Sequence, residues 1–303
     1  MKTNRVNPLV FLTLSLFILA SSSFAQKAKP VAKSSKLIIF AVLNDGKTLE
    51  PLANVNKGKL SEPVDGADDQ NVVVAFNKSN YKPGTIYRLV FGGSNGGSTT
   101  VKSSDATAEC SRNMGTVVSK PAKTPLKGFV MALATNIPIT NKAAAYRRKP
   151  TVDEKSEIDS LVKKEFVRQK LTPTTLKYHN LTALDVDNDG KAEFVGTYWI
   201  DIDKLTRGML FFIADKGSNA KYSLNFSDYR TIDQASTMSG EISAVDGGVY
   251  HELLLDVLDY DNDAVGEIFT YVQSFEGSGF SAYKRSSGKW TRVYEGSNYH
   301  CGY

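Results

Sequence analysis

An acidic segment occurs twice in this chain, and the repeat constrains the fold more than any other feature. Leu184 to Phe194 reads LDVDNDGKAEF, and 74 residues later Leu258 to Ile268 reads LDYDNDAVGEI. In each copy one short, strand-like apolar run comes before the acidic segment and three more follow it. Runs of this kind, bounded by turn residues, are typical of β-strands. The C-terminal half therefore predicts a duplicated unit of four strands, with the acidic loop between the first two.

The first acidic loop has the residue types and the spacing that a hard cation needs. Calcium takes six to eight oxygen ligands at about 2.3 to 2.6 Å. Positions one, three, five, seven and nine of the loop are filled by Asp185, Asp187, Asp189, the backbone carbonyl of Lys191, and Glu193. Gly190 can adopt the left-handed conformation that wraps the turn. We predict a calcium site here, because clustered aspartates without a counter-ion repel one another; an acidic hairpin without a metal is the alternative.

The second loop repeats the pattern with one substitution. Its equivalent positions are filled by Asp259, Asp261, Asp263, the backbone carbonyl of Val265, and Glu267. Ala264 stands where the first loop has glycine, which would cost roughly 1 kcal/mol or more if the left-handed turn is kept. We therefore expect a weaker or reshaped site. An EF-hand is excluded for the first loop for two reasons. Position twelve is Gly196 instead of glutamate, and the flanking segments have the alternating polar and apolar residues of strands and not the pattern of helices.

The segments DVDNDGKAEFV and DYDNDAVGEIF resemble the calcium loops of FG-GAP repeats, also called VCBS repeats. These repeats occur in integrin α-chains and in many secreted bacterial proteins, including proteins of unknown function. The resemblance covers Leu181 to Tyr294. It implies propeller-like four-stranded units, with calcium held by the three aspartates and the glutamate of each loop.

The N-terminus has the features of a secretory signal peptide. Lys2 and Arg5 precede an apolar run from Pro8 to Ala20, and the small residue Ala25 stands before Gln26. The apolar run is shorter than the roughly 20 residues that span a bilayer. We predict a signal peptide at 1–25 and a basic linker at 26–36, and hence a secreted or periplasmic protein without stable membrane insertion.

Charge and cysteine content limit the partners and the compartment. The chain carries a net charge of +5, and loss of the two basic residues of the signal peptide leaves +3. The remaining chain has no basic stripe interleaved with aromatic residues, so nucleic-acid binding is not expected. Cys110 and Cys301 are its two cysteines. In an oxidising compartment such a pair is expected to form a disulfide bond.

The first half predicts a β-rich domain over residues 37–145. Short runs rich in Val, Ile, Phe and Thr, among them Val72 to Phe76, are separated by turn residues. Asn44 to Gly46 has hairpin chemistry. The glycine-rich run from Phe91 to Ser98 is interpreted as a hairpin tip and not as a phosphate loop, since a strand-like run follows it in place of a helix.

One amphipathic helix is predicted between the two halves. Thr151 and Glu154 have the spacing of a capping box, and the helix should end near Leu171. Its apolar side is formed by Ile158, Leu161, Val162 and Phe166. The expected fold is mainly β with one central helix: an N-terminal β-rich domain, then a second domain at 151–303 that contains the helix and two four-stranded FG-GAP-like units.

Signals for catalysis are sparse, and no catalytic residue is predicted. The histidines His179, His251 and His300 share no ligand spacing, and Ser278 lacks the G-x-S-x-G elbow of a nucleophile. We expect an exported calcium-binding β protein with a structural, adhesive or ligand-binding role. The alternative is a secreted hydrolase that uses an unrecognised carboxylate site, with Glu252 or Glu276 as its acid or base.

Aromatic residues could supply a partner surface. Those of the C-terminal strands are Tyr198, Trp199, Tyr271, Phe275, Phe280, Tyr283, Trp290 and Tyr294. Alternation along strands would place some of them inward, in the core, and others outward. An extracellular protein or a carbohydrate is the kind of partner that an outward-facing aromatic set would fit.

Overall fold

The structure is a computed structural model that describes residues 36–64, 69–123, 125–128, 130–139, 147–236, 245, 251–274 and 276–301. All of them belong to one compact unit, Ala32–Tyr303. The predicted signal peptide at 1–25, the predicted linker up to residue 35, and Phe275 lie outside the described residues. Within the described ranges no helix is long and apolar enough to cross a membrane.

The first half forms a sheet that closes on itself. Its strands are β1 (Leu37–Leu43), β2 (Thr48–Asn56), β3 (Lys59–Ser61), β4 (Ile86–Phe91), β5 (Ser94–Ser104), β6 (Gly115–Pro121) and β7 (Val130–Thr135). They follow the order β1-β7-β4-β5-β6-β2-β3, and β1 also pairs with β2. Six strands therefore make a small barrel, to which β3 adds a short hairpin. The predicted turn at Asn44 to Gly46 joins β1 to β2, with all three residues at positive φ.

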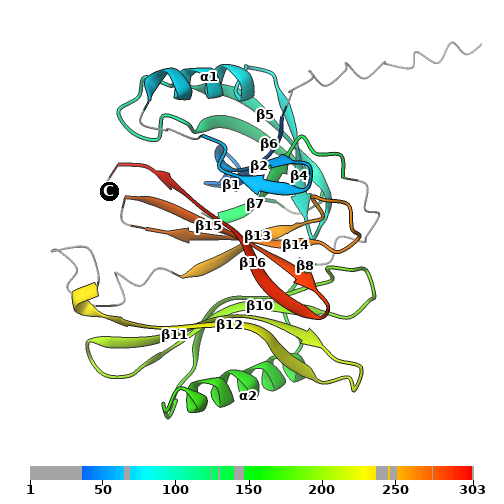
Figure 1. The fold of residues 1–303 in the computed structure, drawn as a ribbon, viewed down its shortest axis with the longest axis vertical. Coiled ribbons are helices and arrows are strands. Elements are labelled where there is room, and N and C mark those ends of the chain that lie inside the picture. The colour runs from blue at the N-terminus through cyan, green and yellow to red at the C-terminus, as the bar shows by residue number, and fades with distance from the viewer. Residues whose placement is uncertain are drawn as a thin grey trace, which may run out of the picture. The chain divides into compact units, whose positions relative to one another are not determined.

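Helix α1 (Gln70–Asn80) covers one side of the closed sheet (Figure 1). The prediction of a strand at Val72 to Phe76 was wrong. The side chain of Asp69 caps the helix by accepting the Asn71 amide at 2.8 Å. The buried residues of α1 are Val73, Phe76, Asn77 and Asn80. Their spacing is helical, so burial on one side outweighs the strand propensity of the valines.

Helix α2 (Val152–Arg168) is the predicted central helix, and its capping box between Thr151 and Glu154 is present. Ile158, Val162 and Phe166 are fully buried. They pack on a five-stranded sheet made of β8 (Arg147–Arg148), β9 (Lys177–Leu184), β10 (Glu193–Asp201), β11 (Thr206–Lys216) and β12 (Tyr222–Asp233). The strands are antiparallel and lie in the order β12-β11-β10-β9-β8. A short 3₁₀ turn, η1 (Gln234–Ser236), follows β12.

The second copy forms a four-stranded antiparallel sheet. Its strands are β13 (Glu252–Leu258), β14 (Glu267–Gln273), β15 (Gly277–Ser286) and β16 (Lys289–Tyr299), and they lie in chain order. The prediction of a strand, a loop and three further strands in each copy is confirmed. The first copy differs only in that β8 adds a fifth strand to its edge.

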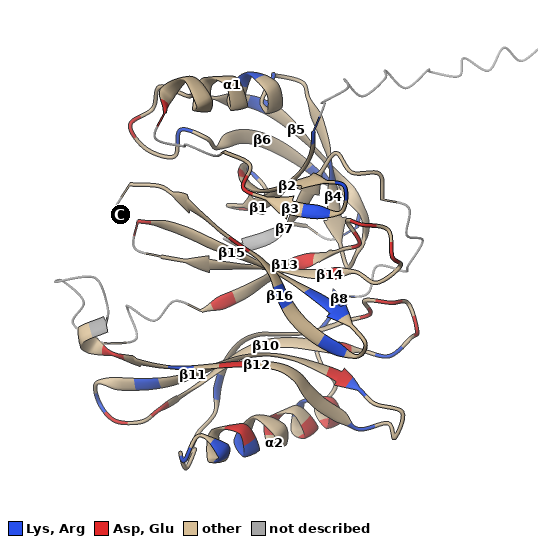
Figure 2. Cartoon of the chain, in the orientation of Figure 1, with Lys and Arg blue, Asp and Glu red and all other residues tan. Residues whose placement is uncertain are grey.

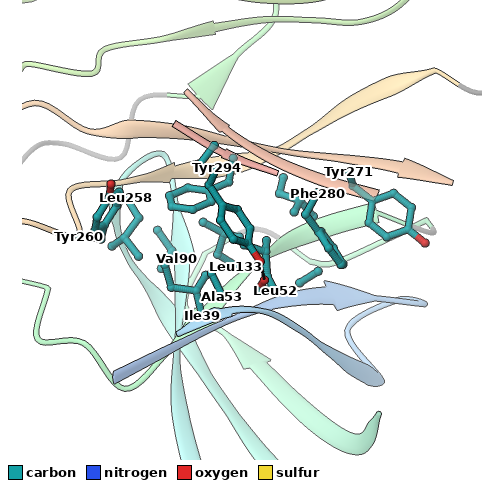
Figure 3. Packing of buried hydrophobic residues seen from close by; sticks show 14 of the residues in the cluster. Ile39, Leu52, Ala53, Val90, Leu133, Leu258, Tyr260, Tyr271, Phe280 and Tyr294 are labelled. Atoms are coloured by element: carbon teal, nitrogen blue, oxygen red, sulfur yellow. Dashed lines mark hydrogen bonds between the residues drawn. The ribbon is translucent and has the colours of Figure 1, made fainter. Parts of the chain in front are cut away.

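The four-stranded sheet lies between the closed sheet and the five-stranded sheet (Figure 1). On one side, Ile39 and Leu133 of the closed sheet share a core with Phe280 and Tyr294 (Figure 3). The Tyr294 hydroxyl donates to the Leu52 carbonyl at 2.7 Å in this core. On the other side, both acidic-loop units contribute to a second core. The regions predicted as separate domains therefore share buried apolar surface.

A buried ion pair lies where the three sheets meet. Arg147 Nη1 donates to the Leu255 carbonyl at 2.7 Å and to Asp256 Oδ2 at 3.0 Å. The amide of Gly93, in the turn between β4 and β5, donates to Asp256 Oδ1 at 3.2 Å. Burial raises the pKa of Asp256. The glycine-rich run is thus a hairpin turn, as predicted, and it packs against the second copy.

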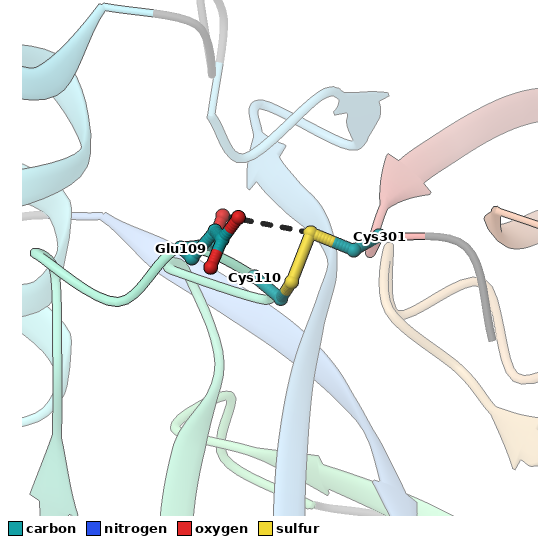
Figure 4. Close-up of a disulfide and its surroundings, with 3 residues drawn as sticks. All are labelled: Glu109, Cys110 and Cys301. Atoms are coloured by element: carbon teal, nitrogen blue, oxygen red, sulfur yellow. Dashed lines mark hydrogen bonds between the residues drawn. A yellow bond between two sulfur atoms is a disulfide. The ribbon is translucent and has the colours of Figure 1, made fainter.

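The predicted disulfide bond between Cys110 and Cys301 is present, with a Cα–Cα distance of 5.2 Å and a sequence separation of 191 (Figure 4). Cys110 lies in the connection between β5 and β6, and Cys301 lies two residues after the end of β16. The bond fixes the end of the last strand to the first half of the chain.

Candidate metal-binding loops

The two acidic loops, here called the first loop (residues 185–193) and the second loop (residues 259–267), have matching backbone conformations. Each joins the first two strands of its unit. Position four is left-handed in both, with φ of 58° at Asn188 and 63° at Asn262. Position six is also left-handed, with φ of 79° at Gly190 and 71° at Ala264. The alanine has kept the glycine conformation.

Position one of each loop organises the turn through the same two hydrogen bonds. The carboxylate of Asp185 accepts the amides of Asp189 and Gly190, both at 3.1 Å. The carboxylate of Asp259 accepts the equivalent amides of Asp263 and Ala264, at 3.2 and 3.1 Å. The repeat is therefore one of geometry and not only of sequence.

Position nine of each loop is a buried glutamate that accepts a backbone amide. Glu193 accepts from Val186 at 3.0 Å, and Glu267 accepts from Tyr260 at 3.3 Å. Burial raises the pKa of Glu193 to about 8 and that of Glu267 to about 7. A bound cation would favour the ionised form of both groups.

Position three carries the signal that points most directly to a ligand. Oδ1 of Asp187 and Oδ1 of Asp261 are buried, and neither accepts a hydrogen bond from the described part of the chain. A buried carboxylate oxygen without a partner is costly, and a cation would satisfy it. The same atom is in this state in both loops.

In each loop three carboxylates come close enough to hold a metal ion. The groups are Asp185, Asp187 and Glu193 in the first loop, and Asp259, Asp261 and Asp263 in the second, with ligand atoms within 4.8 Å of one another. Two of the predicted carboxylate ligands lie outside these groups. Asp189 is held by the side chain of Lys191, at 2.7 Å, and Glu267 by Lys284, at 2.9 Å. The amide of Val265 donates to Asp263 at 2.9 Å.

Two basic residues that belong to no recognised motif contact the loops. Lys284 contacts the second loop and Arg285 contacts the first, and both residues belong to β15. Figure 2 shows the acidic residues of both loops in red. The contact of Arg285 with the first loop could not be predicted, because β15 pairs with no strand of the first unit in the described part of the chain and only packing between the two units brings the residues together.

The two loops are in direct contact. The Gly266 amide donates to the Val186 carbonyl at 2.7 Å. A Cβ atom at Gly266 would lie 2.2 Å from Val257 Cγ1, so the contact requires glycine. The backbones of the two loops are therefore joined by a hydrogen bond.

The residues of the hydrolase alternative do not form one site. Glu252 is buried and accepts the hydroxyls of Thr270 and Tyr283, each at 2.6 Å. Glu276 is exposed, and its carbonyl accepts the amide of His300 at 2.7 Å. The two carboxylates therefore have different surroundings, one in the core and one in solvent.

Ser278 and His300 belong to a buried polar cluster around Glu50. Ser278 Oγ donates to Glu50 Oε1, His300 Nε2 lies 2.6 Å from the same oxygen, and Asn298 Nδ2 donates to it at 2.9 Å. In a serine hydrolase the imidazole stands between the serine and the carboxylate, whereas here the carboxylate stands between the other two. The cluster joins β2 to the end of the second copy, and its order differs from that of a serine-hydrolase triad.

Most of the aromatic residues considered as a partner surface are in the core. The buried ones are Tyr198, Tyr271, Phe280, Tyr283, Trp290 and Tyr294. Trp199 is half-buried and stacks on His179, with ring centroids 5.0 Å apart. Inward packing therefore accounts for six of these residues.

Comparison of the chain with protein-family models, with curated proteins and with solved structures gives no match. Function must therefore be inferred from the chemistry of the loops themselves.

Proposed function

We propose that this protein is an exported calcium-binding β protein whose first acidic loop holds a calcium ion. The observation that carries the proposal is the buried Oδ1 of Asp187, which accepts no hydrogen bond from the described residues and is grouped with the carboxylates of Asp185 and Glu193. Calcium prefers oxygen ligands and tolerates irregular geometry, which suits a turn. The second loop offers an equivalent set of oxygens.

The ligands of the first loop would be carboxylate oxygens of Asp185, Asp187 and Glu193, with the Lys191 carbonyl as predicted from the spacing. A divalent cation would supply positive charge among these three carboxylates. The protein holds the ligand oxygens in place. Backbone amides donate to Asp185 and Glu193, and Arg285 donates to Asp187. The ion would thereby stabilise the turn between β9 and β10.

The role that fits such a site is structural, adhesive or ligand-binding. Both units are antiparallel sheets with strands in chain order and the acidic loop after the first strand, which supports a relationship to FG-GAP repeats. The disulfide bond and the N-terminal sequence support export to a secreted or periplasmic location. Calcium there is abundant enough for affinities of about 0.1 to 1 mM.

Calorimetric titration of the mature chain with calcium chloride tests the proposal. We expect binding in the wild type and its loss in Asp187→Asn, which removes the charge and keeps the shape. The matched control is Asp153→Asn, which removes one exposed carboxylate at the start of α2 and should bind as the wild type does. Equal binding by Asp187→Asn and wild type, or no binding by either, would reject the first loop as a calcium site.

A further inference from the structure

Neighbouring residues of one strand reach different acidic loops. Lys284 and Arg285 follow each other on β15, and successive side chains of a strand point to opposite faces. Lys284 contacts the second loop, in its own unit, while Arg285 contacts the first loop, in the other unit. Each loop thus has one basic partner from β15, but the two basic side chains are held differently.

The ammonium group of Lys284 lies among three carboxylates of the second loop. Its Nζ is 2.5 Å from Asp261 Oδ2, 2.6 Å from Asp263 Oδ2 and 2.9 Å from Glu267 Oε1. A lysine ammonium has three protons, and each of them has an acceptor here. Two of these distances, those to Asp261 and Asp263, lie within the 2.3 to 2.6 Å at which calcium binds oxygen. The ammonium and a metal ion bound by the same oxygens therefore exclude each other.

Arg285 does not fill the first loop in this way. Its guanidinium donates to Asp187, but it lies 3.6 Å from Glu193 Oε1 and 4.0 Å from Asp215 Oδ1. It also stands over the Trp290 ring, 5.8 Å from the centroid. A planar guanidinium beside the loop binds one carboxylate from the side, whereas a point charge such as the lysine ammonium can occupy a cage of oxygens.

We propose that Lys284 is the resident cation of the second loop, so that the protein binds divalent ions at the first loop alone. The second loop keeps the carboxylates of a metal site, but an internal ammonium donates to three of them. Because the ammonium is tethered, the second loop stays closed whatever the calcium concentration. Ala264 keeps the left-handed conformation of Gly190, so the two loops have the same backbone shape and the difference between them lies in the ammonium group.

The test is the number of calcium ions bound per chain, measured by equilibrium dialysis against calcium chloride. We expect one ion in the wild type and two in Lys284→Met, which keeps most of the apolar stem and removes the charge. Adding Asp261→Asn to Lys284→Met should return the number to one. Equal numbers in the wild type and in Lys284→Met would overturn the proposal.

A second variant decides the question even if Lys284→Met does not fold. Asp261→Asn alone should bind as many ions as the wild type, since the second loop takes none. Loss of one ion in this variant, with Lys284 still in place, would overturn the proposal.

The expected count of one ion in the wild type rests on the calcium site proposed for the first loop. The role proposed for Lys284 does not depend on that site. If the wild type binds none and Lys284→Met binds one, the role of Lys284 stands and the proposed function falls. If Asp187→Asn abolishes binding in the wild type while Lys284→Met gains nothing, the proposed function stands and the role of Lys284 falls.

Discussion

The guanidinium of Arg285, on β15, donates to the carboxylate of Asp187 in the first loop, 98 residues earlier in the chain. The bond crosses from one copy of the duplicated unit to the other. Both side chains are largely buried, with exposed fractions of 16% and 25%, so the pair is screened less than a surface salt bridge. The two acidic loops are therefore part of the contact between the units.

Replacing Arg285 by methionine should destabilise the protein. Breaking a largely buried ion pair leaves an uncompensated charge, at a cost of about 3 kcal/mol in the free energy of unfolding. Urea denaturation in the presence of a chelator measures the loss, which millimolar calcium should reduce by neutralising the same carboxylates. Arg168→Met is the control. Its side chain is 68% exposed in its pair with Glu165, and its removal should cost less than about 1 kcal/mol. Equal losses in the two variants would contradict a structural role for Arg285.

Replacing Ala264 by glycine should stabilise the second loop. The residue has φ of 71°, which costs a non-glycine residue roughly 1 kcal/mol or more. The reverse change, Gly190→Ala at φ 79°, should destabilise by a similar amount. A Cβ at Gly190 would meet nothing within 4 Å, so only backbone strain is at issue. Thermal denaturation of both variants gives the comparison, and shifts of the same sign would refute the equivalence of the two turns.

Substitutions of Arg147 and Asp256, which pair where the sheets meet, should have coupled effects on the free energy of unfolding. Arg147→Met leaves the fully buried Asp256 carboxylate without its counter-ion, which should cost about 3 kcal/mol or more. Adding Asp256→Asn should recover part of that loss, because the buried charge is gone. A double-mutant cycle with denaturant measures the coupling. Strictly additive effects of the two changes would argue against the pair.

Protonation of Glu154 at acid pH should lower the stability of the N-terminal end of α2. Hydrogen bonds from Arg148 and the Thr151 amide lower the pKa of Glu154 to about 2, from 4.5. A lowered pKa stabilises the fold above the unfolded-state value, and the contribution is lost as pH falls from about 4.5 towards 2. Glu154→Gln should therefore be less stable than the wild type at pH 7, by up to about 3 kcal/mol, with the difference closing near pH 2. A difference independent of pH would contradict this account.

The duplicated unit could be predicted from sequence because its signals are local. Apolar runs around each loop define the strands, and the spacing from Asp185 to Glu193 defines the loop. The disulfide bond followed from having two cysteines and a signal for export. These features need no knowledge of which distant strands pair.

What could not be predicted depends on contacts between distant parts of the chain. The strand propensity of Val72 to Phe76 hid helix α1, whose helical spacing becomes evident only when Asn77 and Asn80 are counted among the buried residues. Closure of the first sheet through the pairing of β1 with β2 has no local signature. Lys284 and Arg285 belong to an ordinary strand pattern, and only the fold places them at the loops.

The central claim, a divalent ion in the first loop, is tested most directly by crystals grown with calcium and measured at a wavelength where its anomalous signal is strong. We predict one anomalous peak, among Asp185, Asp187 and Glu193, and the Lys284 ammonium at the centre of the second loop. Absence of a peak in the first loop at saturating calcium would contradict the account.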